Sequence, residues 1–260
     1  MILERSYNDA NIWLHSTPFK WKPGWKLNKD EFQDGLRIRY SLEPKFCPTS
    51  CPAPKCGKPF SIAHIDTCKS HGLIIKRHDD IKYIFAKYAE KAFGLGKTAV
   101  EPSLGHLSIE ANNFIVGNKT DQARADLLIH GFLQPLRTTF LDICIVSNLC
   151  SSNIGSSIEQ PIKAAETRKR KSYEDRIRKQ LNGDFLPVVI SSGCVWGLSA
   201  IKTMKTLASK LAGNNKDKNA EIRKSIRTDV CFSLLKARTL AIRSPRSTLE
   251  NQLFRVRNIR

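Results

Sequence analysis

The chain has 260 residues, of which 41% are hydrophobic, so it holds enough apolar material for a folded core and is not a chain disordered throughout. Lysine and arginine number 43 against 24 acidic residues, a formal charge of +19, and such an excess usually reflects a polyanionic partner. Nucleic acid is the first candidate for that partner. An anionic membrane is the second, but the sequence has no run of about 18 apolar residues that could span a bilayer. The first 15 residues carry charges and lack the apolar stretch of a secretory signal, so we expect an intracellular protein, located in the nucleus and without a membrane partner.

Residues 1–45 form a Trp-rich lead-in, and residues 46–75 form a segment dominated by cysteine, proline and glycine. The lead-in ends in DEFQDGLRIRY, whose apolar positions predict a short helix. The second segment has too few apolar residues to fold by burial alone, so it needs a staple such as a metal ion. We therefore expect a helical lead-in followed by a small zinc-binding finger.

From Lys76 onward helical and strand patterns alternate, which predicts an α/β core with a central mixed sheet flanked by helices. The run TTFLDICIV is rich in β-branched and aromatic residues and is the clearest strand. The predicted helices are 77–93, 160–181, 201–211 and 221–242, the predicted strands are 98–104, 124–129, 138–146 and 187–190, and loops fall at 111–119, 147–157 and 213–219. We expect this core to occupy residues 76–246, before a basic tail at 247–260.

Four cysteines and a histidine lie between residues 47 and 68, and in an intracellular chain such a cluster predicts a metal site rather than disulfides. Zinc takes four thiolate or imidazole ligands in a tetrahedron, usually as two close pairs on tight turns. A Cys-Gly turn supplies one pair, and a His-x3-Cys spacing matches the facing pair on a helical turn. The predicted zinc ligands are Cys51, Cys56, His64 and Cys68, with Cys47 as the alternative to Cys51 and His71 as a spare.

Two acidic residues lie in predicted strands. Asp126 opens one strand, and Asp142 lies in the middle of the next with apolar neighbours on both sides, where a carboxylate is costly unless it is paired or binds a metal. Adjacent strands would bring both to the same end of the sheet, where two carboxylates can hold Mg²⁺. The following helix offers Lys169, with Tyr173 one turn away, to orient the attacking water and offset charge on the phosphate. The alternative is an ion pair of Asp142 with Arg124 and a merely solvated face on that helix.

At this point several stretches become recognisable, in order along residues 10–246. They are NIWLHSTPF, LNKDEFQDGLRIRY, the Cys-Cys-His-Cys finger, KRHDDIKYIFAKY, EPSL with DQARADLLIHGF, TTFLDICIV, TRKRKSYEDR, FLPVVISSGCVWG and DVCFSLLKARTLAIRSPR. Together they resemble the restriction-like endonuclease region that follows the reverse transcriptase of site-specific non-LTR retrotransposons, and a related region associated with animal reverse transcriptases. The chain departs from the family pattern at Asp79, Ala125 and Cys194, and none of these replaces an expected catalytic group.

The resemblance implies a restriction-endonuclease-like fold of the PD-(D/E)xK type. It implies that Asp126 and Asp142 bind the catalytic Mg²⁺ or Mn²⁺, that Lys169 is the active lysine, and that Tyr173 supports the site. The sequence has no Tyr-x-Asp-Asp motif, so no reverse transcriptase is expected in this chain, which is read as a truncated copy, a fragment or a domesticated gene.

Basic residues predict the path of the nucleic acid, whose contacts would be sensitive to salt and largely indifferent to sequence. Glu101 is a candidate third carboxylate of the metal site, and the alternative is a surface acid at the end of a strand. Trp196 is expected in the core rather than as a base-stacking platform. The predicted nucleic-acid contacts are Arg77, His78, Arg168, Arg170, Lys171 and Arg176, with Lys163, Arg178 and Lys179 beside them and a second group at Arg223, Lys224, Arg227, Lys236, Arg238 and Arg243. For Arg77 and His78, a structural pair at the start of the helix is an equal alternative to a phosphate contact.

Three functions follow as hypotheses. The first is a Mg²⁺-dependent endonuclease that nicks double-stranded DNA and leaves an end able to prime reverse transcription. The second is a non-catalytic, zinc-containing module that binds DNA or the RNA of the element, from a decayed or domesticated copy. The third is a basic structural protein in which zinc is only a staple. The oligomeric state is left open by all three.

Overall fold

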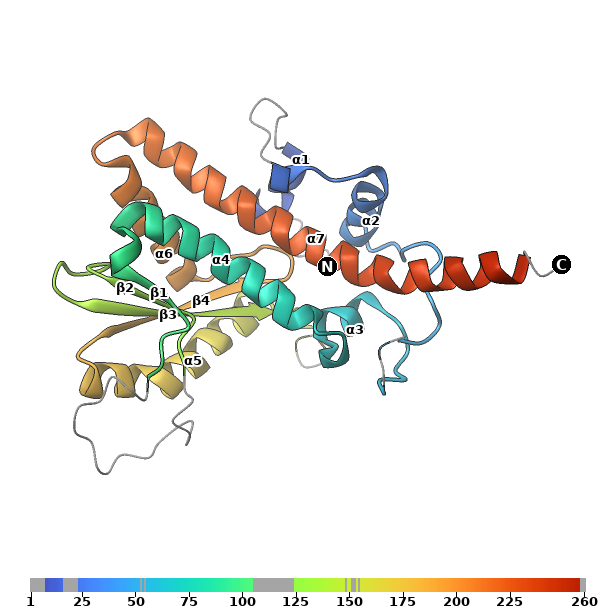
Figure 1. The fold of residues 1–260 in the computed structure, drawn as a ribbon, viewed down its shortest axis with the longest axis horizontal. Coiled ribbons are helices and arrows are strands. Elements are labelled where there is room, and N and C mark those ends of the chain that lie inside the picture. The colour runs from blue at the N-terminus through green and yellow to red at the C-terminus, as the bar shows by residue number, and fades with distance from the viewer. Residues whose placement is uncertain are drawn as a thin grey trace.

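The computed structural model describes residues 8–15, 23–51, 53, 55–104, 124–147, 149–150, 153 and 155–257. Over these residues the fold is α/β, with a mixed sheet between helical layers (Figure 1). The helices are α1 (Ile12–His15), α2 (Lys29–Arg39), α3 (Ile62–Thr67), α4 (Leu73–Phe93), α5 (Glu159–Gln180), α6 (Leu198–Ala212) and α7 (Lys216–Arg257), and the strands are β1 (Thr98–Val100), β2 (Leu127–His130), β3 (Thr138–Val146) and β4 (Asp184–Ser191). Short 3-10 turns occur at Asn8–Asn11, Pro23–Trp25, Lys69–His71 and Leu95–Lys97.

The sheet has the strand order β1-β2-β3-β4. The pairs β1–β2 and β2–β3 are antiparallel, and β3 pairs with β4 in parallel, with α5 as the crossover between them. Pro187 lies inside β4, where proline is tolerated because β4 is an edge strand and one side of it needs no ladder hydrogen bond. The predicted central mixed sheet flanked by helices is confirmed.

Alternate residues of β3 face two different layers, as the period of two in a strand requires. Leu141 and Ile143 join the main core with α4, α6 and α7, whereas Phe140 packs on the α5 side. Asp142 follows Phe140 by two positions and therefore points to the α5 face. The strand thus places one acidic side chain in an otherwise apolar layer.

Most predicted elements are confirmed, with shifted ends. The strand predicted at 98–104 ends at Val100, since Glu101 has a positive φ of 52° that breaks the extended conformation. The strand predicted at 187–190 is longer, because β4 pairs with β3 along its whole length. The first core helix begins at Leu73, directly after Gly72 with φ 68°. The loop predicted at 111–119 lies outside the described residues.

The finger segment packs against helices that are distant in sequence. Ile65 of α3 shares a small buried cluster with Ile38 of α2 and with Ala241 and Ile242 of α7. In Figure 1 the long helix α7 runs beside α6, α4 and α2, which it contacts, and its C-terminal end reaches past the finger. The predicted boundary between the core and the basic tail falls inside α7.

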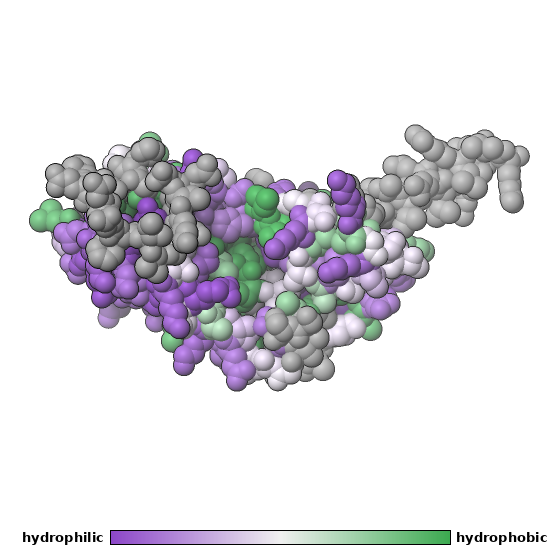
Figure 2. Space-filling model, turned by 90° about the horizontal axis from the view of Figure 1, so that it is seen from below, coloured by the Kyte–Doolittle hydropathy of each residue, from purple (hydrophilic) through white to green (hydrophobic). Residues whose placement is uncertain are grey.

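The face below the sheet is covered by α5. Figure 2 views this side, and hydrophilic side chains gather over α5. Lys163, Arg168, Lys171, Arg178 and Lys179 are all exposed there. No helix within the described ranges is long and apolar enough to cross a membrane.

Candidate zinc cluster and carboxylate site

Two of the predicted zinc ligands lie in a tight hairpin. Cys51 donates its backbone N–H to the carbonyl of Lys58 at 2.8 Å, and Cys56 donates to that of Ala53 at 3.1 Å. Lys55, directly before Cys56, has a positive φ of 62°, and Gly57, directly after it, has a positive φ of 60°. This turn directs both thiols to the same side.

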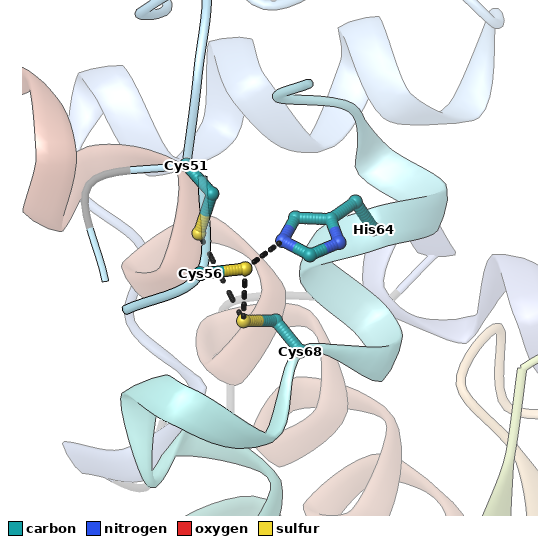
Figure 3. Close-up of side chains that lie close together, drawn as sticks. All are labelled: Cys51, Cys56, His64 and Cys68. Atoms are coloured by element: carbon teal, nitrogen blue, oxygen red, sulfur yellow. Dashed lines mark hydrogen bonds between the residues drawn. The ribbon is translucent and has the colours of Figure 1, made fainter. Parts of the chain in front are cut away.

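The other two ligands come from α3. His64 is in its first turn, where the hydroxyl of Ser61 caps the backbone N–H of His64 at 3.1 Å, and Cys68 is the residue that ends the helix. One helical turn separates the two side chains, so both can face the hairpin (Figure 3). The local sequence alone therefore orients each pair.

The four ligand atoms of Cys51, Cys56, His64 and Cys68 lie within 4.8 Å of one another. The Sγ of Cys68 is 3.8 Å from the Sγ of Cys51 and 3.8 Å from that of Cys56, and Cys56 Sγ is 3.3 Å from His64 Nε2. Two thiolates bound to zinc at about 2.3 Å in a tetrahedron are about 3.8 Å apart, which matches these sulfur separations. The cluster could hold a metal such as zinc.

Cys51, rather than Cys47, belongs to this group, as preferred from the sequence. Cys47 instead packs against the buried cluster around Ile38 and Ile65. All eight cysteines are outside disulfides. Cys51 is deeply placed, and burial raises the pKa of its thiol to about 11.

Between the α3 ligands lies a buried acid that connects the finger to the core. Asp66 accepts hydrogen bonds from Arg238 Nε at 3.1 Å and Nη2 at 2.9 Å, and from Arg77 Nη1 at 3.4 Å. The hydroxyls of Ser192 and Ser147 donate to the same carboxylate at 2.9 and 3.3 Å. This network joins α3, α4, α7 and the loops after β3 and β4.

Arg77 is among the predicted nucleic-acid contacts, and its position corrects that prediction. Its side chain is only 7% exposed and is paired with Asp66. Burial lowers the pKa of Arg77, and the attraction of Asp66 opposes this effect. Arg238 of the second predicted basic group is equally buried, so neither guanidinium is exposed to a phosphate.

The two predicted catalytic acids come together at the junction of β2 and β3. The register pairs Leu127 with Leu141, so Asp126, directly before β2, falls beside Asp142. The Oδ2 of Asp126 accepts the backbone N–H of Ile143 at 2.6 Å. The charge of Asp126 contributes to raising the pKa of Asp142, in keeping with their proximity.

Asp142 is paired with Lys169 of α5. The side chain of Asp142 is 7% exposed, and Lys169 Nζ lies 2.8 Å from its Oδ2. The contact is a close ion pair. Burial raises the pKa of Asp142, and Lys169 offsets only part of that rise. The alternative pairing with Arg124 is wrong, because Arg124 lies 3.8 Å from Glu101 instead.

Tyr173 lies one turn beyond Lys169 on the same helix. Lys169 Nζ is 5.6 Å from the centre of the Tyr173 ring, and that ring packs on Phe185 of β4 with centroids 5.6 Å apart. The tyrosine therefore supports the lysine from the side of the sheet.

His78, at the start of α4, contacts the pair from the other side. Its Nε2 is 3.1 Å from Asp126 Oδ2, and its Nδ1 is 3.4 Å from Asp79 Oδ1. The hydrogen bond to Asp126 raises the pKa of His78, against the opposing effect of burial. The residue predicted to bind phosphate thus lies at the carboxylate site.

The structure adds a lysine that the sequence reasoning missed. Lys82 is buried in α4 and its Nζ lies 2.7 Å from Asp79 Oδ1 and 2.5 Å from Glu101 Oε1. The sequence pattern that could have revealed Lys82 is its place beside Ile81 and Phe85 on the apolar side of a helix. Such a lysine must find acidic partners, and here they adjoin the site.

The remaining predicted nucleic-acid residues lie on α5. Arg170 donates to the hydroxyl of Ser199 at 2.9 Å, and Arg176 donates to the carbonyl of Leu104 at 3.3 Å. Both side chains therefore already make hydrogen bonds within the fold. Arg168 and Lys171 are exposed.

Comparisons of the chain with protein-family models and with curated proteins give no match.

Proposed function

We propose that the chain is a metal-dependent endonuclease that nicks double-stranded DNA, built on a restriction-endonuclease-like core related to that of non-LTR retrotransposons. One observation carries the proposal. Asp126 and Asp142 lie side by side on adjacent strands, and Lys169 Nζ of α5 lies 2.8 Å from Asp142 Oδ2, so two carboxylates and a lysine converge on one point. Carboxylates from neighbouring strands are suited to hold a divalent cation.

The donor set fits a hard divalent cation. Asp126 and Asp142 offer carboxylate oxygens from adjacent strands, and Mg²⁺ or Mn²⁺ is commonly bound through one or two carboxylates together with substrate phosphate. When bound, the ion would polarise the scissile phosphate as a Lewis acid. The strands fix the two acids without a flexible loop, since Asp126 is tied to the backbone of β3 through Ile143.

Lys169 would act as a cation at the reacting phosphate. Burial lowers its pKa, but the charge of Asp142 outweighs that effect and the pKa is raised, so the amine stays protonated at neutral pH. A protonated lysine would orient the attacking water and offset the negative charge that develops on the phosphoryl oxygens, and it would not serve as the base. Water adds one P–O bond while the P–O3′ bond breaks. The leaving oxygen gains a proton, and the new 5′-phosphate releases one to solvent.

DNA would approach over α5, where the exposed cations gather (Figure 2). Their contacts to phosphate would position the duplex without reading its bases. The Cys-Cys-His-Cys cluster would hold zinc as a structural staple for the finger, because residues 46–72 are poor in apolar side chains.

The test is relaxation of supercoiled plasmid by the purified chain with Mg²⁺ or Mn²⁺, beside its Asp142→Asn variant. Asp175→Asn is the matched control, because Asp175 is an exposed acid on α5 and its change removes the same charge. We expect nicking by the wild type and by the control but not by Asp142→Asn. Intact plasmid with every protein and either metal, under conditions where DNA binds, would refute the endonuclease.

A second candidate is a module that binds DNA or RNA without cutting it. The ion pair between Lys169 and Asp142 favours it, since this pair satisfies the buried carboxylate without a metal. If wild type and Asp142→Asn both shift DNA in a gel and neither nicks it, this function replaces the first.

A further inference from the structure

The helix that carries two of the finger's ligand residues also carries an acid on its opposite side. Asp66 lies between His64 and Cys68, two positions from each, and two positions along an α-helix correspond to a rotation of about 200°. His64 and Cys68 point toward the hairpin cysteines (Figure 3). The side chain of Asp66 points the other way, into the core, where it is only 1% exposed.

A helix as short as α3 does not hold its own conformation. It has six residues, whereas isolated helices shorter than roughly 12–15 residues are marginal in water. The hydroxyl of Ser61 caps its first turn, Ile65 packs against α2 and α7, and the ligand group includes His64 near its start and Cys68 at its end. A metal bound by that group would therefore be a main support of the position from which Asp66 reaches the core.

The core presents two buried cations to this one carboxylate. The side chains of Arg77 and Arg238 are each 7% exposed, and both bind Asp66. Arg77 also donates through Nη2 to the backbone carbonyl of Asp66 at 3.1 Å. Burial is the main cause that lowers the pKa of Arg77, and the charge of Arg238 lowers it further, so the two cations lie close enough to repel. Without the charge of Asp66, two like charges would remain buried close together, which costs much free energy.

The same carboxylate holds the ends of two strands. Ser147 directly follows β3 and Ser192 directly follows β4, and the hydroxyls of both donate to Asp66 Oδ2. Ser192 also donates its backbone N–H to the carbonyl of Val146 at 2.8 Å. Asp66 is thus the point at which the finger meets the sheet, the start of α4 and the middle of α7.

We propose that Asp66 couples zinc binding in the finger to the packing of the core, so that each strengthens the other. Zinc fixes α3, and α3 places the carboxylate that neutralises Arg77 and Arg238. The reverse follows from thermodynamic reciprocity, because a network that favours this position of α3 also raises the affinity of the finger for zinc. The finger is then a metal-dependent part of the core rather than a separate module on a flexible tether.

Hydrogen exchange of the full chain, with zinc and after its removal by a chelator, tests the first direction. We expect the amides of residues 73–81 and 234–242 to exchange about 5- to 150-fold faster without zinc, the usual range of coupling between two sites. Helix α5 is the internal control, because its main contacts are with β3 and β4, and its exchange should change less. Faster exchange confined to residues 46–72, or an equal change in α5, would overturn the proposal.

Zinc affinity, measured by competition with a chromophoric chelator, tests the reverse direction. Asp66→Asn removes the charge that holds the two arginines and should weaken zinc binding by a factor in the same range. The matched control Asp175→Asn changes an exposed acid of α5 and should keep the wild-type affinity. Circular dichroism of the zinc-loaded proteins checks that each variant is folded. Wild-type affinity in a folded Asp66→Asn would overturn the coupling.

A milder pair of variants keeps the test decisive if Asp66→Asn does not fold. Ser192→Ala removes one hydroxyl donor to Asp66 and should weaken zinc binding by a smaller factor. Ser172→Ala removes an exposed hydroxyl of α5 that donates within its own helix, and it should leave the affinity unchanged. Equal affinities in these two variants would also overturn the coupling. Neither readout depends on DNA cleavage, so its result is separate from that of the plasmid test.

Discussion

The finger and the carboxylate site are two candidate metal sites whose ligand groups differ in chemistry and in their protein partners. In the finger, three sulfurs and a nitrogen converge at spacings that match a zinc tetrahedron. At the carboxylate site, each acid already has a protein partner: Lys169 for Asp142, and His78 for Asp126. Three sulfurs and a nitrogen grouped in this way form a site that could hold a metal such as zinc, whereas carboxylates can be balanced by lysine or histidine. Geometry therefore argues more directly for the zinc than for the magnesium.

Removing the finger's metal should have the largest effect. Cys51→Ser should lose bound zinc and open residues 46–72 to proteolysis, because apparent zinc binding contributes about 10–16 kcal/mol to folding in isolated fingers. Zinc content and limited proteolysis measure both results. Cys47→Ser is the matched control and should keep its zinc, since Cys47 is outside the ligand group. Full zinc content in Cys51→Ser would reject the assigned ligand set.

The docking of the finger should depend on Asp66. Asp66→Ala leaves Arg77 and Arg238 buried without their partner, which should lower the free energy of unfolding by about 3–5 kcal/mol. Asp30→Ala removes the exposed partner of Arg243 and should cost less than about 1 kcal/mol. Urea unfolding of both variants with zinc present measures the difference. Equal losses would mean that the buried network does not attach the finger to the core.

The carboxylate site should respond in rate rather than in stability. Lys169→Met should slow plasmid nicking by about 100- to 1,000-fold, the usual cost of losing one donor at a reacting oxyanion. Lys205→Met, an exposed lysine of α6, should nick at the wild-type rate. Single-turnover nicking and DNA affinity, measured together, separate chemistry from binding. An unchanged rate in Lys169→Met would end the catalytic assignment of this lysine.

The smallest expected effect is on DNA affinity, and it tests which region of the protein contacts the DNA. Arg168→Ala combined with Lys171→Ala should weaken binding and flatten the plot of log affinity against log salt, by about 0.9 for each phosphate that the protein no longer neutralises. The paired substitution in the finger, Lys55→Ala with Lys58→Ala, also removes two exposed charges and should change the slope less. A larger change of the slope in the finger variant would mean that the finger, rather than α5, makes the main contacts with DNA.

Local features of the sequence anticipated much of this molecule. The strand at 138–146 is confirmed residue for residue, and Trp196 is in the core. The four predicted ligand residues also come together as a group that could hold a metal, because the separation of Cys51 and Cys68 in sequence is short and two turns suffice to bring the atoms together. The sequence predicts Asp126 and Asp142 at the same end of the sheet on neighbouring strands, and the antiparallel register of β2 and β3 puts them side by side.

Residues whose partners are far away in sequence were misjudged. Arg77 reads as a surface cation beside His78, yet it is buried against Asp66, and Arg238 reaches the same acid across 172 positions. Lys82 gives only a weak local signal, because its partner Glu101 comes from a different element. Charge alone does not tell whether a cation faces solvent or an acid inside the fold.

The sequence by itself determined the periodicities, the turns and the ligand spacings, since these depend on contacts within a few residues. Only the tertiary structure decided which charges are buried and which cation each acid holds. The physical reason is that burying a charge costs much free energy unless an opposite charge lies beside it. Whether two charges come together depends on how α4, α5 and α7 pack on the sheet and the finger.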